Sequence, residues 1–197
     1  MKLTLHNISK SFGDLAVLNN LSLALESGQI YCLMGPSGVG KTTLLRILMG
    51  LEKADSGQYL IEGDDARLED IRISAVFQED RLCESFTPVE NVMMVTGKRL
   101  TQVQVRQELC RLLPEESLNR PAATLSGGMK RRTAICRALL APFDILLMDE
   151  PFTGLDDETR QLVIHYVQEK SAGKLVLLTT HQVQDVDALQ ATLLQLY

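Results

Sequence analysis

The segment Gly35–Thr43, GPSGVGKTT, decides how the rest of this chain is interpreted. Its spacing fits G-x-x-x-x-G-K-[ST], and it stands between the strand-like run QIYCLMG and the helix-like run KTTLLRILMGL, which Gly50 ends. Glycines let successive backbone N–H groups point at a phosphate chain, and the following helix adds partial positive charge at its N-terminus. A glycine-rich turn that merely precedes a lysine would not need this strand and helix around it. The segment therefore predicts a phosphate-binding loop.

Side chains at the end of this loop suit the charged parts of a nucleotide. Lys41 is expected to bind the β- and γ-phosphates, and the hydroxyl of Thr42 is expected to bind a Mg²⁺ ion. The residues that we expect to bind the nucleotide here are Gly35, Pro36, Ser37, Gly38, Val39, Gly40, Lys41, Thr42 and Thr43.

A second segment, ILLMDEP, supplies two carboxylates at the end of an apolar strand, the edge where sheets of this kind bind ligands. Asp149 is expected to reach Mg²⁺ through water, and Glu150 to orient or deprotonate an attacking water. Because consecutive side chains of an extended chain point to opposite faces, the two carboxylates suit two separate roles. The alternative is a pair of acidic residues that is only solvated.

The remaining pattern indicates an α/β fold. Between turn signals, the runs LTLHNIS, LSLAL and QYLIEG predict a small antiparallel region. From Phe86 to Leu140 the pattern is mostly helical: Thr101 caps QVQVRQELCRLL, Pro114 ends it, and MKRRTAICRALL follows. The strand-like runs ILLMD and KLVLLTTH then flank the helix-like run DETRQLVIHYVQEK. Strands that alternate with helices predict a mostly parallel sheet, into which the helical middle is inserted.

Composition excludes several classes of protein. With 197 residues, of which 45% are hydrophobic and 23% charged, the chain has enough material for one core, and its apolar runs are too short for a bilayer. The N-terminus lacks the pattern of a signal peptide, so the chain is expected to stay in the cytosol. A net charge of −5 argues against a general nucleic-acid surface.

The four cysteines point to no special chemistry. They are far apart, with no C-x-x-C and no histidine at ligand spacing, so neither a disulfide framework nor a zinc site is predicted. Free thiols buried in the core are expected at Cys32, Cys83, Cys110 and Cys136.

Six segments in a characteristic order resemble the nucleotide-binding subunit of an ATP-binding cassette (ABC) transporter, over nearly the whole chain. They are the phosphate-binding loop (P-loop), VFQED, LSGG, LLMDEP, TGLDD and TTH. The resemblance implies a P-loop NTPase of the ABC type, with a mostly parallel core sheet, a small antiparallel β region and an inserted helical sub-domain. We expect one domain, 1–197, with the helical sub-domain at roughly 84–140.

The resemblance also assigns roles to four further residues. Phe12 is the aromatic residue that stacks on adenine, for which a flat ring is the physical requirement. Gln78 contacts Mg²⁺ and the water region and links them to the helical insertion, and Asp156 lies in a loop that crosses a dimer interface. His181 contacts the γ-phosphate; the alternative is a histidine that caps a carbonyl at a strand end.

The segment LSGGMKRRTAICRALL places two glycines, which have no side chain, at the N-terminus of a basic helix. A helix N-terminus made of Ser126, Gly127 and Gly128 suits an anion. By the resemblance, it closes over the ATP of a second copy, or of a paralogous cassette, in a head-to-tail dimer; a flexible hinge is the alternative. The basic run is interpreted as a solvated helix face without assigned contacts, at Lys130, Arg131, Arg132 and Arg137.

Some residues depart from the family's pattern. Met129 stands where most members carry glutamine, and it cannot replace the hydrogen bonds of an amide, so some nucleotide contacts are expected to be lost. LSGGM, together with VFQED and VENV, is similar to the nitrate, sulfonate and taurine importer branch. Gln182 replaces the acidic residue that often follows the histidine, which puts the positioning of His181 in question. Because the chain ends at Tyr197, a C-terminal regulatory domain is expected to be absent.

The interpretation is an ATPase that uses ATP and Mg²⁺ and drives transport, with import of a small oxyanion or sulfonate favoured. The expected partners are an integral membrane permease, which would hold the protein on the inner face of the membrane, and a solute-binding protein, with no nucleic acid. The permease is expected to insert a short cytoplasmic helix into the groove between the two sub-domains, and the candidate residues for that surface follow Gln78 and include Phe86 and Glu90. The alternatives are a soluble ABC protein acting on nucleic acid or ribosomes and a cassette that binds ATP without turnover.

Overall fold

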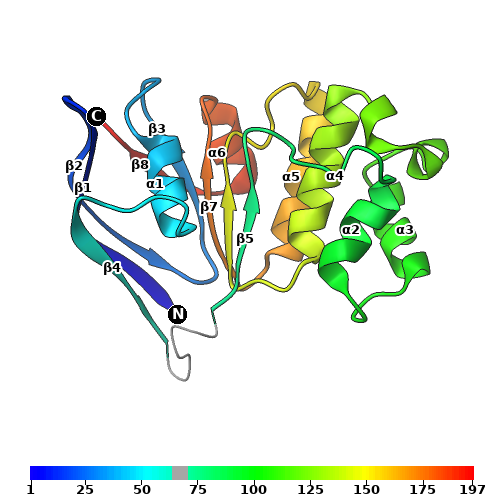
Figure 1. Cartoon of the computed structure of the whole chain (residues 1–197), viewed down its shortest axis with the longest axis horizontal. Helices are drawn as coiled ribbons and strands as arrows, with labels where there is room; N and C mark the ends of the chain where they lie inside the picture. The colour runs from blue at the N-terminus through cyan, green and yellow to red at the C-terminus, as the bar shows by residue number, and fades with distance from the viewer. Residues whose placement is uncertain (64–70) are drawn as a thin grey trace.

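The strands form one antiparallel and one parallel sheet in the computed structural model, which describes residues 1–63 and 71–197 (Figure 1). The strands are β1 (Lys2–Phe12), β2 (Leu15–Glu26), β3 (Ile30–Met34), β4 (Ser56–Glu62), β5 (Ile73–Val76), β6 (Ile145–Met148), β7 (Leu175–Thr179) and β8 (Thr192–Gln195). The α-helices are α1 (Lys41–Leu48), α2 (Pro88–Thr96), α3 (Gln102–Cys110), α4 (Gly127–Leu140), α5 (Asp157–Lys170) and α6 (Val183–Leu189), with 3-10 turns η2 (Glu115–Asn119) and η3 (Ala122–Thr124).

The antiparallel sheet has the strand order β2-β1-β4, which confirms the small antiparallel region predicted from the alternating runs. Leu3, Leu5 and Ile8 of β1 are buried on one face of this sheet. They share a core with Leu44 and Leu45 of α1. This arrangement places the antiparallel sheet against the helix that follows the phosphate-binding loop.

The parallel sheet has the order β5-β6-β7-β3-β8, and every adjacent pair of its strands is parallel. All residues of β6 are buried, as expected for a sheet covered on both faces. Leu146 and Met148 belong to the core that includes α2 to α6, whereas Ile145 and Leu147 belong to the core that includes α1 and the antiparallel sheet. The two faces of one sheet therefore support two cores, and the predicted α/β fold is confirmed.

The helical middle contains α2, α3 and α4, which pack against one another (Figure 1). Thr101 caps α3 as predicted, in a reciprocal capping box with Gln104. The helix ends at Cys110, whereas the sequence predicted continuation to Leu113. The N–H groups of Leu112 and Leu113 still donate to the carbonyl oxygen of Leu109, so the chain continues as a hydrogen-bonded turn up to Pro114. α4 also packs against β5 and α5, so this helix connects the helical middle to the sheet.

The parallel arrangement brings the carboxyl ends of β3, β5, β6 and β7 to one edge of the sheet. Figure 1 shows that α1, α4 and α5 all begin at this end of the molecule.

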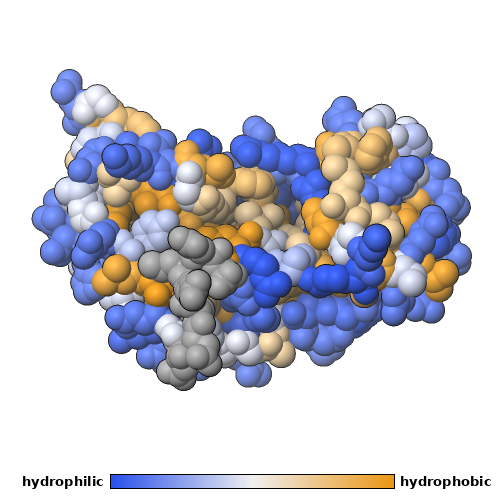
Figure 2. Space-filling model, turned by 60° about the horizontal axis from the view of Figure 1, so that its bottom comes forward, coloured by the Kyte–Doolittle hydropathy of each residue, from blue (hydrophilic) through white to orange (hydrophobic). Residues whose placement is uncertain are grey.

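Among the described residues, none of the helices has the length and apolar character needed to cross a bilayer. In Figure 2, which brings the opposite end forward, apolar surface gathers in the middle of the face and hydrophilic surface surrounds it.

Candidate functional site

The phosphate-binding loop connects β3 to α1 and depends on glycine at two close approaches. A Cβ atom at Gly40 would lie 2.5 Å from the carbonyl oxygen of Val17 and 2.7 Å from Leu18 of β2, and Gly40 has φ +100°. A Cβ atom at Gly35 would lie 2.6 Å from the carbonyl oxygen of Leu196. The antiparallel sheet and the segment after β8 thus enclose the loop and require bare backbone there.

Lys41 is the first residue of α1 and is only 7% exposed. Its ammonium donates to the carbonyl oxygens of Gly35 at 2.7 Å and Pro36 at 3.0 Å, so the side chain lies back across the loop. A lysine ammonium has three donors, and the first N–H groups of a helix have no partner within the helix. The loop therefore concentrates positive potential where a phosphate chain would lie.

All three of the predicted magnesium-site residues line one cavity of about 140 Å³ beside α1. They are Thr42 from α1, Gln78 from the loop after β5, and Asp149 at the end of β6. Their hydroxyl, amide and carboxylate oxygens are the hard ligands that Mg²⁺ prefers, and Mg²⁺ usually keeps water and phosphate oxygens as its other ligands. No group of three or more His, Cys, Asp or Glu residues in the described part of the chain could hold a metal alone. The three oxygens provide part of the coordination that a Mg²⁺ ion needs, and water and phosphate oxygens would complete it.

Thr179, at the end of β7, connects the two predicted acidic residues. Its hydroxyl donates a hydrogen bond to Oδ1 of Asp149 at 2.7 Å, and the hydroxyl oxygen of Thr179 also accepts the backbone N–H of Glu150 at 2.8 Å. Thr179 is fully buried and Asp149 is 5% exposed, so both hydrogen bonds are shielded from water. Interpretation of the sequence missed Thr179, although it is the first residue of the TTH segment, which drew attention only to His181.

Glu150 does not continue the extended strand, so the prediction that its side chain simply alternates with that of Asp149 is wrong. β6 ends at Met148, and Glu150 has φ +47°, a left-handed conformation that costs a non-glycine residue about 1 to 3 kcal/mol. The hydrogen bond from its N–H to Thr179 stabilises this conformation. A turn, rather than the pleat of a strand, therefore sets the direction of the Glu150 side chain.

The predicted base and the predicted phosphate-contacting histidine lie in direct contact. Oε1 of Glu150 is 3.0 Å from Nε2 of His181. Both residues line a small cavity of about 40 Å³, next to Thr179. A cavity of this size has room for a water molecule, and its polar walls could hold one.

The loop around His181 is well supported although Gln182 replaces an acidic residue. The hydroxyl of Thr180 donates to Asp185 at 2.5 Å and accepts the N–H of Gln182 at 3.1 Å. The side-chain oxygen of Gln182 accepts a hydrogen bond from Arg160 of α5. Arg160 and Asp185 therefore hold the loop that carries His181, whose positioning the sequence put in question. Asp185 is 2% exposed.

The segment Ser126–Gly128 forms the start of α4, as expected, and Ser126 is the N-cap: its hydroxyl accepts the N–H of Met129 at 3.3 Å. α4 packs on β5, whereas the phosphate-binding loop follows β3, and two strands lie between these. At the usual spacing of strands, β5 and β3 are about 14 Å apart. The structure therefore does not place Ser126 over the phosphate-binding loop of its own chain.

Asp156 caps α5 close to this helix start. Its carboxylate accepts hydrogen bonds from the N–H of Thr159 at 2.9 Å and from the Thr159 hydroxyl at 2.8 Å, and these bonds lower the pKa of Asp156. A Cβ atom at Gly128 would lie 3.6 Å from Leu155, so the LSGG and TGLDD segments are neighbours. They form a second cluster, apart from the cavity lined by Thr42 and Gln78.

The basic residues of α4 are mostly not a solvated face, and that interpretation is wrong. Arg131 and Arg132 donate to backbone carbonyls of Phe77 and Leu112, and Arg137 donates to the carbonyls of the 80–81 loop segment. The reason is that α4 packs against α2, α5 and β5 at once, which leaves little of its surface in water. Lys130, whose nearest acidic partner is at 3.9 Å, is the exception.

Phe12 lies at the end of β1, at the turn into β2, and its side chain is about half exposed at 49%. Lys10 places its ammonium 5.1 Å from the centre of the ring. An exposed, flat ring is available for stacking, as its predicted role requires.

All four cysteines are free, but they are not all buried. Cys32 and Cys136 lie in the core, and burial raises the pKa of each thiol to about 12. Cys83 is half-buried, and Cys110 is exposed because it ends α3 on the side that faces solvent. The prediction of thiols buried in the core is therefore confirmed for Cys32 and Cys136 and wrong for Cys83 and Cys110.

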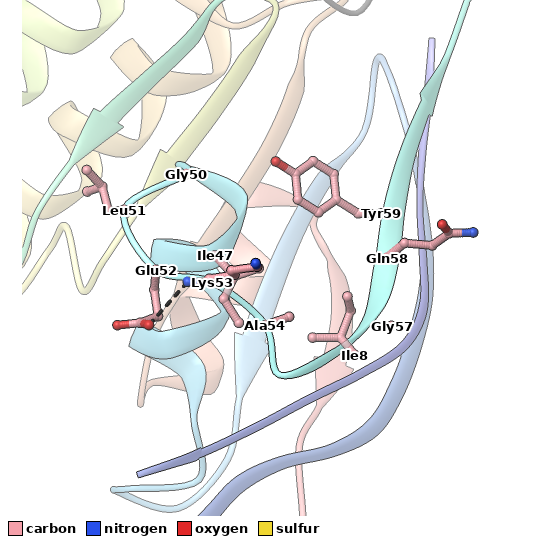
Figure 3. A pocket seen from close by; sticks show the side chains of 10 residues that line it. All are labelled: Ile8, Ile47, Gly50, Leu51, Glu52, Lys53, Ala54, Gly57, Gln58 and Tyr59. Atoms are coloured by element: carbon pink, nitrogen blue, oxygen red, sulfur yellow. Dashed lines mark hydrogen bonds between the residues drawn. The ribbon is translucent and has the colours of Figure 1, made fainter.

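A larger hollow, of about 630 Å³, lies between α1 and the antiparallel sheet (Figure 3). Buried Ile8 and Ile47 line it together with half-buried Tyr59, and at its rim the N–H of Lys53 donates to Glu52. None of the predicted site residues lines this hollow. The chemistry of the side chains, and not the volume of a cavity, therefore identifies the candidate site.

Comparison with known proteins points in the same direction. The profile of the family described as "ABC transporter" matches residues 18–153. The Nod factor export ATP-binding protein I of Cupriavidus metallidurans is 37% identical over 95% of this chain and 65% of its own length. The sulfate/thiosulfate import ATP-binding protein CysA of Methylococcus capsulatus is 40% identical over 94% of this chain and 57% of its own length. The chain thus spans about three fifths of the length of these curated relatives.

The fold also matches solved structures. The dimeric structure of MJ0796, a bacterial ABC transporter cassette, superposes with a TM-score of 0.84 and 27% identity, over 98% of this chain and 94% of that chain. A dimeric post-hydrolysis state of the same cassette, bound to ADP and Pi, has a TM-score of 0.81 and 26% identity over the same shares.

Proposed function

The chain belongs to the ABC transporter family, and from that premise we propose that it binds and hydrolyses ATP to drive transport through a separate membrane permease. The observation that carries the proposal is the cavity shared by Thr42, Gln78 and Asp149, beside the bare phosphate-binding loop. When bound, ATP supplies the phosphoryl group and Mg²⁺ neutralises its charge. We also propose that 1–197 is one ATPase domain, with its helical sub-domain at roughly 84–140.

The residues of the chain divide the work of hydrolysis. Lys41 would neutralise phosphate oxygens from within the loop, and Thr42, Gln78 and Asp149 would hold the metal. Glu150 would orient the attacking water or accept its proton, and His181, whose Nε2 lies 3.0 Å from the Glu150 carboxylate, would hold that carboxylate and contact the γ-phosphate. Positioning and charge neutralisation are the main contributions that a protein makes to phosphoryl transfer.

We propose that two copies form a head-to-tail dimer when ATP is bound. The strand β5, on which α4 packs, lies about three strand spacings from the strand that precedes the loop, so a second copy, or a paralogous cassette, would bring its helix start over that loop. The dimeric state of MJ0796, which shares this fold, supports the arrangement. Asp156, next to the same helix start, would lie at the interface, and Phe12 would stack on the adenine.

The permease is proposed to contact the surface that follows Gln78 and to hold the protein, in the cytoplasm, on the inner face of the membrane. Phe86 is 40% exposed, which supports a role in binding an apolar partner. Glu90 is exposed but caps α2, since its carboxylate accepts from Thr87 at 2.8 Å. A test at this position should therefore use Glu90→Gln, which preserves a capping side chain, together with Phe86→Ala.

Import of a small oxyanion or sulfonate, with a solute-binding protein as a further partner, is the proposed transport reaction. It is supported by the LSGGM segment and by the relative that imports sulfate or thiosulfate. Export is the second candidate, because another relative is a Nod factor export protein.

Two variants and one purification test the proposal. Lys41→Ala is expected to lose nucleotide binding or turnover, and Glu150→Gln is expected to accumulate as an ATP-bound dimer in size-exclusion chromatography. Tagged Glu150→Gln protein, purified with Mg-ATP from gently solubilised cells, should bring down a polytopic membrane protein. Recovery of ribosomes or nucleic-acid proteins in its place would refute the transport assignment while leaving the ATP chemistry standing.

A further inference from the structure

Arg131 of α4 joins the start of the predicted dimer-facing helix to the loop that carries Gln78. Its side chain is 10% exposed, and its guanidinium donates to the carbonyl oxygen of Phe77 at 2.6 Å and to that of Gln78. Its Nε lies 3.1 Å from Oδ1 of Asp80. One buried side chain therefore contacts three residues of the loop.

This contact set determines the orientation of the backbone at Gln78. The guanidinium is planar and its donors have a fixed fork geometry. When such a group binds two successive carbonyl oxygens, it fixes the tilt of the peptide units on both sides of Gln78. That tilt determines the direction in which the Gln78 side chain leaves the backbone, toward the cavity that it shares with Thr42 and Asp149.

A second arginine of the same helix holds the following part of the loop. Arg137 donates to the carbonyl oxygen of Arg81 at 2.9 Å and to that of Asp80 at 3.1 Å. The guanidinium of Arg81 in turn stacks 4.1 Å from the centre of the Phe77 ring. The first part of the loop after β5, from Phe77 to Arg81, is thus attached to α4 by two arginines.

The position of Arg131 along α4 gives this attachment a consequence. Arg131 follows Ser126 by five residues, which corresponds to about 7.5 Å along the helix axis. A displacement of the helix start is transmitted through this short, hydrogen-bonded helix to the guanidinium and from there to Gln78.

We propose that Arg131 is a positioning residue that couples the Ser126 end of α4 to the Gln78 side chain, and so sets the affinity of the site for its metal. The inference rests on the proposed function, because it requires that a metal–nucleotide complex binds beside Gln78. Arg131 acts only through Gln78 and touches neither nucleotide nor metal.

The test compares Arg131→Met and Arg131→Lys with Lys130→Met, a control that removes a charge from the neighbouring position without a close contact. Mn²⁺ affinity is measured by electron paramagnetic resonance with a non-hydrolysable ATP analogue, alongside kcat, KM for ATP and the unfolding temperature. Groups that orient metal ligands change metal affinity or turnover about 10-fold or more when removed. We expect Arg131→Met to weaken Mn²⁺ binding and lower kcat ~10-fold, with KM for ATP unchanged.

Arg131→Lys keeps the charge but loses the fork, so it should weaken Mn²⁺ binding in the same direction; it serves as the test variant if Arg131→Met does not fold. A folded Arg131 variant with wild-type Mn²⁺ affinity and wild-type kcat would overturn this inference and leave the proposed function standing. An equal loss of Mn²⁺ affinity in Lys130→Met would have the same consequence. If the wild-type protein binds no Mn²⁺ with the nucleotide analogue, the proposed function and this inference both fall.

Discussion

Replacement of Thr179 by valine is the sharpest test of the candidate site. Valine has nearly the shape of threonine, so Thr179→Val preserves most of the packing, and its effect comes from the loss of the hydroxyl. That hydroxyl makes two hydrogen bonds, to Asp149 at 2.7 Å and to the N–H of Glu150 at 2.8 Å. The substitution therefore leaves a buried carboxylate without its donor and a strained backbone without its acceptor.

The expected loss of stability follows from these contacts. A hydrogen bond to a charged group contributes about 1.5 to 3 kcal/mol, and an unpaired buried N–H costs about 1 to 3 kcal/mol more. Because Glu150 is only partly buried and such effects are not additive, we expect Thr179→Val to lower the free energy of unfolding by about 2 to 4 kcal/mol. For a domain of this size, that corresponds to a melting temperature lower by roughly 5 to 15 °C.

Calorimetry and a steady-state ATPase assay would measure the two consequences. Because Thr179 orients the predicted metal-site carboxylate and the base, kcat should fall ~10- to 100-fold at temperatures where the variant is folded. Thr179→Ser is the matched control: it keeps the hydroxyl, loses about 1 kcal/mol for the missing methyl group, and should retain most activity. A Thr179→Val protein with wild-type melting temperature and wild-type kcat would refute the reasoning.

Three further predictions concern the loop, an ion pair and the thiols. Gly40→Ala should unfold at a lower temperature and lose binding of a fluorescent ATP analogue, because its Cβ would lie 2.5 Å from the Val17 carbonyl; Gly38→Ala, whose Cβ meets nothing within 4 Å, should lose less on both measures. The hydrogen bond with Arg111 lowers the pKa of Glu169 to about 2. A carboxylate whose pKa is lower in the folded than in the unfolded chain stabilises the fold at every pH above its unfolded pKa of about 4.3, and this contribution is lost as the pH falls toward the folded pKa. In urea titrations, the advantage of wild type over Glu169→Gln should thus be full near pH 6 and shrink as the pH falls toward 2; an advantage independent of pH would contradict this. At pH 8, Cys110 should react with a thiol reagent and its signal should vanish in Cys110→Ser, whereas Cys32 and Cys136 should react only after unfolding.

Local patterns predicted most of the fold. The glycine-rich loop after β3, the capping residue Thr101 and the alternating runs of the antiparallel sheet all lie where their own sequences indicate. These features depend on backbone angles, helix caps and side-chain periodicity, which involve residues close together in the chain. The end of α3 at Cys110 was missed by three residues, because residues 111–113 continue as a hydrogen-bonded turn that the apolar pattern does not separate from the helix.

Predictions failed where the environment of a side chain depends on distant elements. The arginines of α4 have the pattern of a solvated face, but α4 lies against the loop after β5 and buries Arg131 there. Glu150 was expected in an extended chain, whereas its backbone turns beneath Thr179. Both cases involve hydrogen bonds between residues that are at least 29 positions apart.

The sequence by itself determined the fold class, the glycine-rich loop and the identity of the side chains that we propose to hold a nucleotide and a metal. Only the tertiary structure decided which of them meet: the strand order β5-β6-β7-β3 brings Gln78, Asp149, Thr179 and the loop before Lys41 to one edge, while Ser126 stays apart. The physical reason is the range of the interactions. Glycine angles, caps and periodicity act over a few residues, whereas strand order and buried hydrogen bonds depend on how the whole chain packs.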